Sequence, residues 1–495
     1  MSSFLTAFSQ INVFYVVALV LGTIAGYVIG ALPGFSATMG VAIFVPFSYG
    51  MDTSTAFAFL IALYCSAVFA GSIPAILIRT PGTPASICTI YDGYPMAQRG
   101  EAGRALGLSC WASIVGGIFS ALVLICAAGF IAKFAISFGH FEYCMLGVLG
   151  LSMVIGMSSD DIVKGLISMA IGLVVPLVGM DSMNGMPRFT FGSTQLLSGL
   201  QQLPVMIGLF AISEVFIGFS NQNRIKVSNQ KITNLFSGLK DLAKNKMLLL
   251  KASLIGTYLG ALPGVGATTA AIIGYDQAKR SSKEPEKMGT GQPEGIIGPE
   301  CANNAVTGGA LIPLLALGIP GDPVTAILLG ALLIHGLQPG PLLFTQSPVV
   351  VKSIYLSVIF SYVVIFFVSV FSIKLMAKLL NIKTSILSGF VLVFCIIGSY
   401  ALRNSYFDVY VTLAFGFLGY WMRKDGYSLG PMTLALVLGT MIEQKFIGAL
   451  KISGGSVLPF VTRPISLVLL LLTILMIVLS SLRIYRARHK TEAKN

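Results

Sequence analysis

The sequence has few charged residues: Asp, Glu, Lys and Arg make up 10% of its 495 residues, whereas 55% are hydrophobic. Soluble domains carry about 25% charged residues, so this scarcity excludes an ordinary soluble protein. No polar stretch is long enough to form a separate soluble domain. At about 20 residues for each membrane span, the chain has room for roughly a dozen spanning or half-spanning helices. We therefore expect an all-α polytopic membrane protein embedded in the lipid bilayer.

The motifs of catalysis, metal clusters and nucleotide binding are also missing. The seven cysteines are scattered without a Cys-x-x-Cys pair, and the three histidines are far apart, so buried thiols are expected rather than disulfides or a metal cluster. The phosphate-binding sequence Gly-x-x-x-x-Gly-Lys-Ser/Thr is absent, which argues against direct driving by ATP. Neither a nucleophile elbow nor a zinc-protease helix is found. We expect no enzyme activity and no covalently bound cofactor.

Basic residues are absent from positions 1–78 and concentrated in two later places, although the net charge is +13. The segment 221–246 and the tail 483–495 are both rich in Lys and Arg. Such an excess marks cytoplasmic loops of membrane proteins. We therefore expect both segments in the cytoplasm, the N-terminus outside, and no binding of nucleic acid.

Each half of the chain interrupts an apolar run with Gly-Ala-Leu-Pro-Gly, at 30–34 and at 260–264. Proline disfavours a helix at the residue before it and glycine permits the turn that follows, so each sequence predicts a broken membrane helix. Further on, Pro-Gly-Thr-Pro at 81–84 corresponds to Pro-Gly-Asp-Pro at 320–323. The same order in both halves indicates an internal duplication. We predict two homologous repeats, inverted across the membrane, with broken helices and re-entrant loops: repeat 1 over 1–220, a basic linker over 221–246, repeat 2 over 247–482 and a basic tail over 483–495.

The breaks are the expected substrate site. Non-helical backbone persists within a membrane only where protein buries it or water lines it, and a helix that begins there presents N–H groups that suit an anion. Paired broken helices in two repeats mark the binding sites of transporters. Two alternatives stay open: each break could be a simple kink, and Arg79 could contact lipid headgroups. The residues expected to bind substrate are Gly34, Ser36, Thr38, Arg79, Thr83, Gly264, Gly266, Thr268 and Thr269.

A cation site is expected in the second half. Asn303 and Asn304 precede an apolar run, and Asp322 occupies the position that Thr83 has in the first half. Amide and carboxylate oxygens coordinate hard cations such as Na⁺, and a carboxylate can also accept a proton. Alternatively, the asparagines could cap a helix and Asp322 could stabilise the turn. We predict Asn303, Asn304 and Asp322 as a candidate Na⁺ site, with Na⁺ or a proton as the coupling ion.

Further motifs join the two breaks of each half. The full set lies at 30–38, 81–84, 179–181, 188–192, 260–268, 299–305 and 309–323. Taken together, these motifs resemble one family over nearly the whole chain: the large membrane subunit of the tripartite tricarboxylate transporter family. The resemblance implies a secondary carrier of the bacterial inner membrane that imports organic carboxylates. It also implies coupling to a Na⁺ or proton gradient, and two partners: a small four-helix membrane subunit and a periplasmic solute-binding protein. An organic-anion channel is the alternative function.

Overall fold

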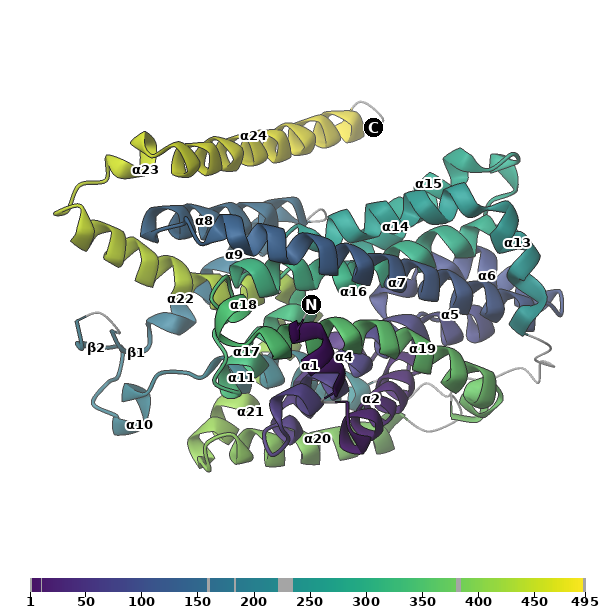
Figure 1. Ribbon diagram of the computed structural model, residues 1–495, viewed down its shortest axis with the longest axis horizontal. Coiled ribbons are helices and arrows are strands. Elements are labelled where there is room, and N and C mark those ends of the chain that lie inside the picture. The colour runs from purple at the N-terminus through teal and green to yellow at the C-terminus, as the bar shows by residue number, and fades with distance from the viewer. Residues whose placement is uncertain are drawn as a thin grey trace. The chain divides into compact units, whose positions relative to one another are not determined.

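The computed structural model describes residues 2–9, 11–157, 161–181, 184–220, 235–379 and 384–492 (Figure 1). Nearly all regular structure in these ranges is helical, and the strands found there are β1 (Gly179–Met180) and β2 (Pro187–Arg188), which pair antiparallel. The expectation of an all-α membrane protein is confirmed in this coarse form, whereas the two repeats and the number of spans stay predictions. Within the described residues, six helical stretches are long and apolar enough to cross a membrane: Val13–Ala31, Thr53–Ile78, Thr89–Ala135, Gln202–Phe219, Pro348–Phe371 and Leu429–Ile452.

The helices group into two compact units. Unit 1 comprises Met1–Lys133 and Met206–Tyr420, and unit 2 comprises Phe134–Val205 and Trp421–Asn495. Each unit therefore combines segments of both predicted repeats. The basic linker expected at 221–246 lies partly outside the described residues, since 221–234 are not among them, and so does the end of the tail, 493–495.

Unit 1 is built around two pairs of closely packed helices. In the first pair, α2 (Val13–Ala31) lies against α4 (Thr53–Ala70). Gly22, Gly26 and Gly30 follow one another along a single face of α2, and a Cβ at any of them would lie 2.2 Å from a carbonyl oxygen of α4. Small residues spaced four apart let two membrane helices bring their backbones together. These glycines therefore determine how closely the pair can pack.

The second pair consists of α14 (Lys246–Ala261) and α16 (Glu294–Leu317). Gly256 and Gly260 of α14 meet carbonyl oxygens of α16 in the same manner. Figure 1 shows α14, α15 and α16 side by side, and α16 is buried from Gly295 to Ala316. A helix that is apolar and buried on all sides belongs to the core of the protein.

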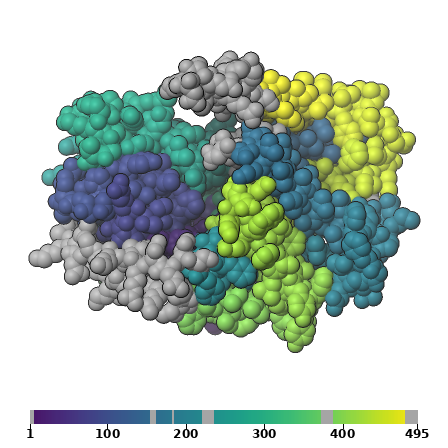
Figure 2. Space-filling model, turned by 180° about the vertical axis from the view of Figure 1, so that it is seen from behind, coloured from purple at the N-terminus to yellow at the C-terminus, as the bar shows by residue number. Residues whose placement is uncertain are grey.

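The remaining helices of unit 1 surround these two pairs. Figure 2 shows early (purple) and middle (teal) segments of unit 1 side by side, and Gly107 of α7 indeed abuts the Leu235 carbonyl group. The helices concerned are α1 (Ser2–Ser9), α3 (Ala37–Ser48), α5 (Ser72–Ile78), η1 (Pro84–Ser86), α6 (Thr89–Gln98), α7 (Ala102–Ala135), the π-helix η3 (Ile207–Ile212), α12 (Ser213–Ser220), η4 (Leu235–Gly238), α13 (Leu239–Lys244), α15 (Gly266–Ser281), η5 (Pro285–Lys287), α17 (Pro323–Ile334), α18 (Leu343–Gln346), α19 (Pro348–Leu379), α20 (Thr384–Ala401) and α21 (Tyr406–Lys424).

Unit 2 is centred on the long helix α22, which packs against α8 and α9. Glu142 of α8 is buried and forms an ion pair of 2.8 Å with Arg463, whose guanidinium also lies over the Phe141 ring. Arg188 forms an ion pair with Glu443 of α22. The carboxyl groups of Glu142 and Glu443 are therefore both paired with arginines. Its elements are α8 (His140–Met157), α9 (Ile162–Val174), η2 (Val175–Leu177), β1, β2, α10 (Thr194–Leu197), α22 (Leu429–Ile452), α23 (Pro459–Thr462) and α24 (Pro464–Glu492), while α11 (Gln202–Met206) ends at the border with unit 1.

Candidate functional site

The two Ala-Leu-Pro-Gly sequences end their helices in the same backbone conformation. Leu32 and Leu262, which follow α2 and α14, are both extended, with φ and ψ of −90° and 118° and of −87° and 120°. Gly34 and Gly264 both have a left-handed backbone, with φ of +89° and +85°. Glycine adopts this conformation without a steric penalty. Both sequences are therefore breaks between two helices, as predicted.

The second break of each half lies after α5 and after α16. Arg79 caps the end of α5 and Gly318 caps the end of α16, and both residues have a left-handed backbone, with φ of 58° and 73°. Asp322 then caps α17: its side chain accepts a hydrogen bond from the Thr325 N–H, and the Thr325 hydroxyl accepts one from the Asp322 N–H. The turn-stabilising role considered for Asp322 is thus present in the structure.

In each half the two breaks are in direct contact. A Cβ on Gly82 would lie 2.0 Å from the Gly30 carbonyl oxygen, and a Cβ on Gly321 would lie 2.4 Å from that of Gly260. Any side chain at these two glycines would overlap the backbone of the neighbouring break. In the second half, the Gly264 N–H also donates to the Gly321 carbonyl over 2.7 Å, so this N–H is engaged within the protein.

Asp322 is buried where the two breaks of the second half meet. Its Oδ2 accepts a hydrogen bond of 2.6 Å from the hydroxyl of Tyr64, which belongs to α4 in the first half. Its Oδ1 accepts from the backbone N–H and the hydroxyl of Thr325. A Cβ on Gly266 would lie 4.0 Å from the Asp322 Cβ, which places the aspartate next to the first residue of α15. These three donors are neutral, so they leave the net charge of an ionised Asp322 uncompensated.

Asn303 and Asn304 lie in the interior of α16, so the alternative that they cap a helix is wrong: α16 begins at Glu294. The Asn303 Nδ2 donates to the Ala85 carbonyl at 3.2 Å and to the Glu300 side chain at 3.3 Å. The Asn304 Nδ2 donates to the Asn303 Oδ1 at 2.6 Å. Glu300 is fully buried and also accepts a hydrogen bond from the Thr89 hydroxyl.

The predicted cation ligands thus have two different sets of hydrogen-bond partners. Asn303 and Asn304 are joined to Glu300, whereas Asp322 is joined to Tyr64 and Thr325. Across the described residues, no three His, Cys, Asp or Glu side chains gather closely enough to hold a metal ion. A cation site in this region would need hydroxyl, amide or carbonyl oxygens as well as a carboxylate.

The predicted substrate residues lie at the breaks but in different environments. Gly34 is exposed, Ser36 caps α3 by accepting from the Met39 N–H, and Thr38, Thr268 and Thr269 are half-buried in the first turns of α3 and α15. Arg79 is exposed, and its guanidinium lies 5.8 Å from the centre of the Tyr94 ring. Both roles considered for Arg79 stay open.

Tyr64 and Tyr362 are not among the site residues predicted from the sequence. Tyr362 is fully buried in α19, and its hydroxyl bonds to the Asn304 carbonyl and to the Thr307 hydroxyl. Each tyrosine places a phenol hydroxyl inside a largely apolar helix. A tyrosine in such a helix could therefore have been recognised from the sequence as a candidate partner of a buried polar group, because a buried phenol usually finds a hydrogen-bond partner.

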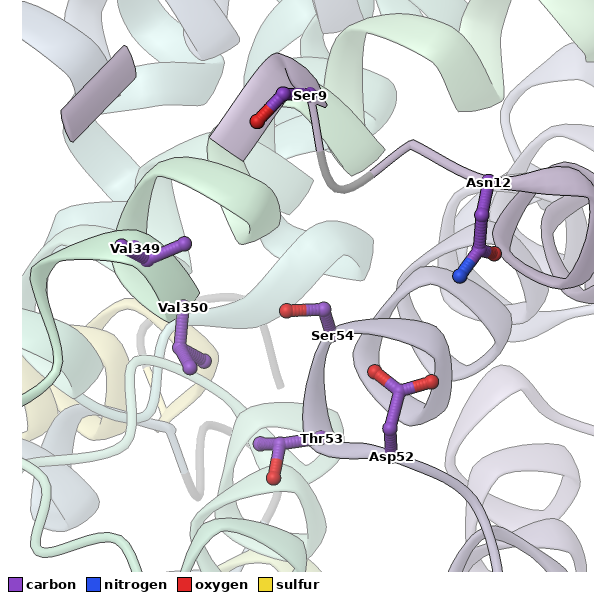
Figure 3. Close-up of a pocket in the computed structure, with 7 residues that line it drawn as sticks. All are labelled: Ser9, Asn12, Asp52, Thr53, Ser54, Val349 and Val350. Carbon is purple, nitrogen blue, oxygen red and sulfur yellow. The ribbon is translucent and has the colours of Figure 1, made fainter. Parts of the chain in front are cut away.

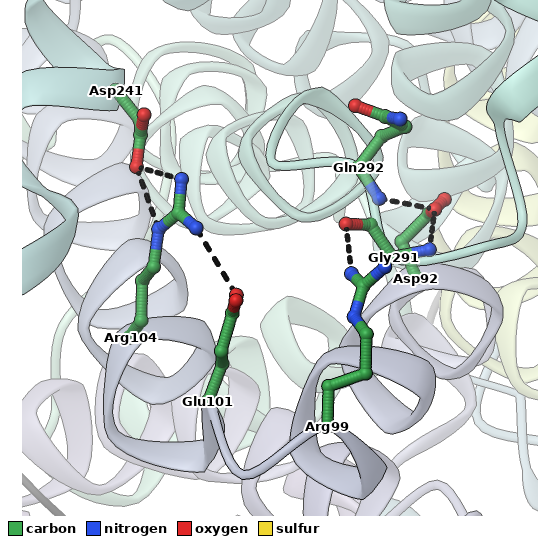
Figure 4. A network of polar contacts seen from close by, with 7 residues as sticks. All are labelled: Asp92, Arg99, Glu101, Arg104, Asp241, Gly291 and Gln292. Atoms are coloured by element: carbon green, nitrogen blue, oxygen red, sulfur yellow. Dashed lines mark hydrogen bonds and ion pairs between the residues drawn. The ribbon is translucent and has the colours of Figure 1, made fainter.

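Asp92 is a further buried carboxylate with a structural role. Its Oδ1 accepts three backbone N–H groups, from Gly289, Gly291 and Gln292, over 2.7–2.9 Å, and its Oδ2 accepts from the Tyr275 hydroxyl. Figure 4 shows this side chain together with Arg99, which donates to the Gly291 carbonyl. The two residues fasten the segment between α15 and α16 to α6.

Two cavities lie away from the breaks. One of about 380 Å³ includes Asn12 and Asp52, which cap α2 and α4, so its polar lining has a structural explanation (Figure 3). The other, of about 930 Å³, lies beside α13, α14 and α15 and is lined by charges of both signs, including Arg104, Asp241 and Lys251. Neither cavity contains a residue predicted to bind substrate.

Comparison with known proteins decides the family. Residues 16–434 match the family described as "Tripartite tricarboxylate transporter TctA family". The chain belongs to this family. It is therefore a subunit of a membrane transporter of the tricarboxylate type, as the motifs indicated.

Two relatives of the chain are proteins of Agrobacterium vitis. An Agrobacterium vitis protein named "Uncharacterized 52.8 kDa protein in TAR-I ttuC' 3'region" is 33% identical over 485 residues, which are 98% of this chain and 96% of that protein. A second protein of the same organism, "Uncharacterized protein in TAR-II ttuC' 3'region", is 37% identical over 233 residues, which are 47% of this chain and 96% of that protein. No solved structure matches the chain.

Proposed function

We propose that this member of the TctA family imports organic carboxylates across the bacterial inner membrane by alternating access. The observation that carries the proposal is the contact between two helix breaks in each half of the chain, made through Gly82 and Gly30 and through Gly321 and Gly260. Broken helices that meet inside a membrane protein provide polar backbone at membrane depth, which is where carriers bind their substrates. All four breaks belong to unit 1.

The substrate carboxylates dock at the helices that begin after the first breaks. Ser36, Thr38, Thr268 and Thr269 supply hydroxyl donors. Gly34 is exposed, but a Cβ there would lie 3.4 Å from the Glu214 Oε1, so the hydroxyls rather than the Gly34 backbone receive the anion. Since the Gly264 N–H is already bonded to Gly321, the hydroxyls of α15 supply the donors in the second half.

Transport of an anion past Asp322 requires a cation. Two like unit charges about 4 Å apart repel by about 4 kcal/mol at an effective dielectric constant near 20. Because Asp322 adjoins the start of α15, a carboxylate can bind there only when a proton or Na⁺ neutralises the aspartate. The coupling gradient thereby drives uptake.

Two partners complete the system: a periplasmic solute-binding protein that delivers the carboxylate, and a small four-helix membrane subunit. Uptake by cells that produce all three tests the proposal. Pro33→Ala with Gly34→Ala should abolish uptake while the protein still inserts into the membrane. Gly50→Ala is the control, since Gly50 has open space around it. Uptake near the wild-type level by the Pro33/Gly34 variant would contradict the proposed site.

A further inference from the structure

Two buried hydroxyl groups near the second break of the first half lack a hydrogen-bond partner within the described part of the chain. Thr83 is 3% exposed and Ser86 is fully buried, and among the described residues neither Thr83 Oγ1 nor Ser86 Oγ has a hydrogen-bond partner. Both oxygens converge on Gly71, where a Cβ would lie 2.3 Å from Thr83 Oγ1 and 2.9 Å from Ser86 Oγ. A buried polar group without a partner destabilises the folded protein. Two of them side by side indicate a missing ligand.

A buried carboxylate, that of Glu300, is linked to the same turn through Asn303. Thr83 and Ser86 flank Ala85, whose carbonyl accepts from Asn303, and Asn303 also donates to Glu300. Glu300 is fully buried, and both donors to its side chain, Asn303 and the Thr89 hydroxyl, are neutral. Burial of a carboxylate is costly unless a cation or a proton accompanies it.

Asp92, on the same helix α6 as Thr89, is a buried carboxylate whose oxygens are well supplied with hydrogen-bond donors from the protein. Three backbone N–H groups and one hydroxyl donate to it. Hydrogen bonds of this kind satisfy the oxygens of a buried carboxylate. Glu300 has half as many donors, and none of them is a backbone N–H. Of these two buried carboxylates, Glu300 is therefore the one whose negative charge lacks compensation.

We propose that Thr83, Ser86 and Glu300 form a Na⁺ site. Hydroxyl and carboxylate oxygens are ligands of hard cations. A proton on Glu300 would neutralise the carboxylate but leave both hydroxyls unsatisfied, whereas a metal cation satisfies all three groups. The neighbouring Glu300 carboxylate also repels an anionic substrate. Thr83, predicted from the sequence to bind substrate, therefore binds the cation instead.

This site differs from the one predicted at Asn303, Asn304 and Asp322. Asn303 keeps a positioning role, because it bridges Glu300 and the Ala85 carbonyl. Binding of Na⁺ here is a property of the chain alone. Only its use as the coupling ion rests on the proposed function, and the two claims can therefore fail separately.

The test is the melting temperature of the purified full-length chain as Na⁺ replaces choline at constant ionic strength, with K⁺ as the comparison ion. A ligand that binds only the native state raises this temperature in a saturable way. The wild type should show such a rise with Na⁺ that is larger than the rise with K⁺. Thr83→Val with Ser86→Ala, and separately Glu300→Gln, should weaken the apparent Na⁺ affinity at least tenfold.

Two control variants separate the site from general damage. Thr83→Ser keeps the hydroxyl and should keep the Na⁺ response. Ser109→Ala removes a buried hydroxyl that is already bonded to Ser72, so it should lower the melting temperature and leave the Na⁺ response unchanged. A wild type without a Na⁺ response, or a Thr83/Ser86 variant with a normal one, would overturn the site. A normal Na⁺ response in a chain that fails to transport any carboxylate would overturn the proposed function alone.

Discussion

The hydroxyl of Tyr64 donates a 2.6 Å hydrogen bond to the Asp322 carboxylate, and this bond joins α4 in the first half of the chain to the start of α17 in the second. Both groups are buried, so the bond forms away from competing water. It ends at the residue that we propose must be neutralised before substrate binds. The bond therefore connects the packing of the two halves with the chemistry of transport.

Tyr64→Phe and Asp322→Asn should be energetically coupled. Each single change should lower the free energy of unfolding by about 1–3 kcal/mol, because it leaves a buried polar partner less satisfied. The double variant should lose less than the sum of the two, since the second change has no bond left to break. Denaturation of the purified variants measures the cycle, with Tyr258→Phe, at an exposed tyrosine, as the control. Strict additivity would show that the bond contributes nothing.

Asn304→Ala and Asp322→Ala should change how uptake depends on the driving ion. Asn304 belongs to the Glu300 network and Asp322 adjoins the start of α15, so each variant alters a group near which a cation is proposed to bind. Initial uptake rates over a range of Na⁺ concentrations and of external pH measure the effect. If both variants kept the wild-type Na⁺ and pH responses, neither residue would take part in coupling.

Gly26→Ala should destabilise unit 1, because the added methyl group would lie 2.2 Å from the Leu63 carbonyl oxygen. Overpacking of this kind costs about 1–3 kcal/mol. Gly129→Ala is the matched control: it makes the same change in the long helix α7, where a Cβ meets nothing within 4 Å. Thermal unfolding in detergent should separate the two variants clearly. Equal melting temperatures would mean that α2 and α4 do not pack as closely as described.

Asp92→Ala should release the segment between α15 and α16, since three of its backbone N–H groups lose their acceptor. Asp92→Asn keeps one acceptor oxygen and should have a smaller effect. The exposed Lys283 and Lys287 lie within this segment, so the rate of tryptic cleavage there reports its release. We expect cleavage to be fastest in Asp92→Ala, intermediate in Asp92→Asn and slowest in the wild type. Equal rates in all three would show that Asp92 does not fasten the segment.

The helix breaks could be predicted from the sequence because they depend on local backbone chemistry. Proline and glycine impose the same turn after Ala31 as after Ala261, whatever surrounds them. The partners of the polar residues could not be predicted, because they depend on tertiary packing. Nothing local to Asp322 indicates Tyr64, which is 258 positions away, and nothing local to Asn303 indicates the Ala85 carbonyl. The cap hypothesis for Asn303 and Asn304 depends on the apolar run that follows them, but that run is only the later part of α16, which begins at Glu294.

The most direct measurement of the proposed function is uptake of a radiolabelled carboxylate into proteoliposomes that contain this chain and the small subunit, with the loaded binding protein outside. With an inward gradient of Na⁺ or protons, we predict saturable accumulation to an internal concentration above the external one. An ionophore that collapses the gradient should abolish the accumulation. If the carboxylate only equilibrated across the membrane, at a rate indifferent to the gradient, the chain would be an organic-anion channel and the proposed carrier mechanism would be wrong.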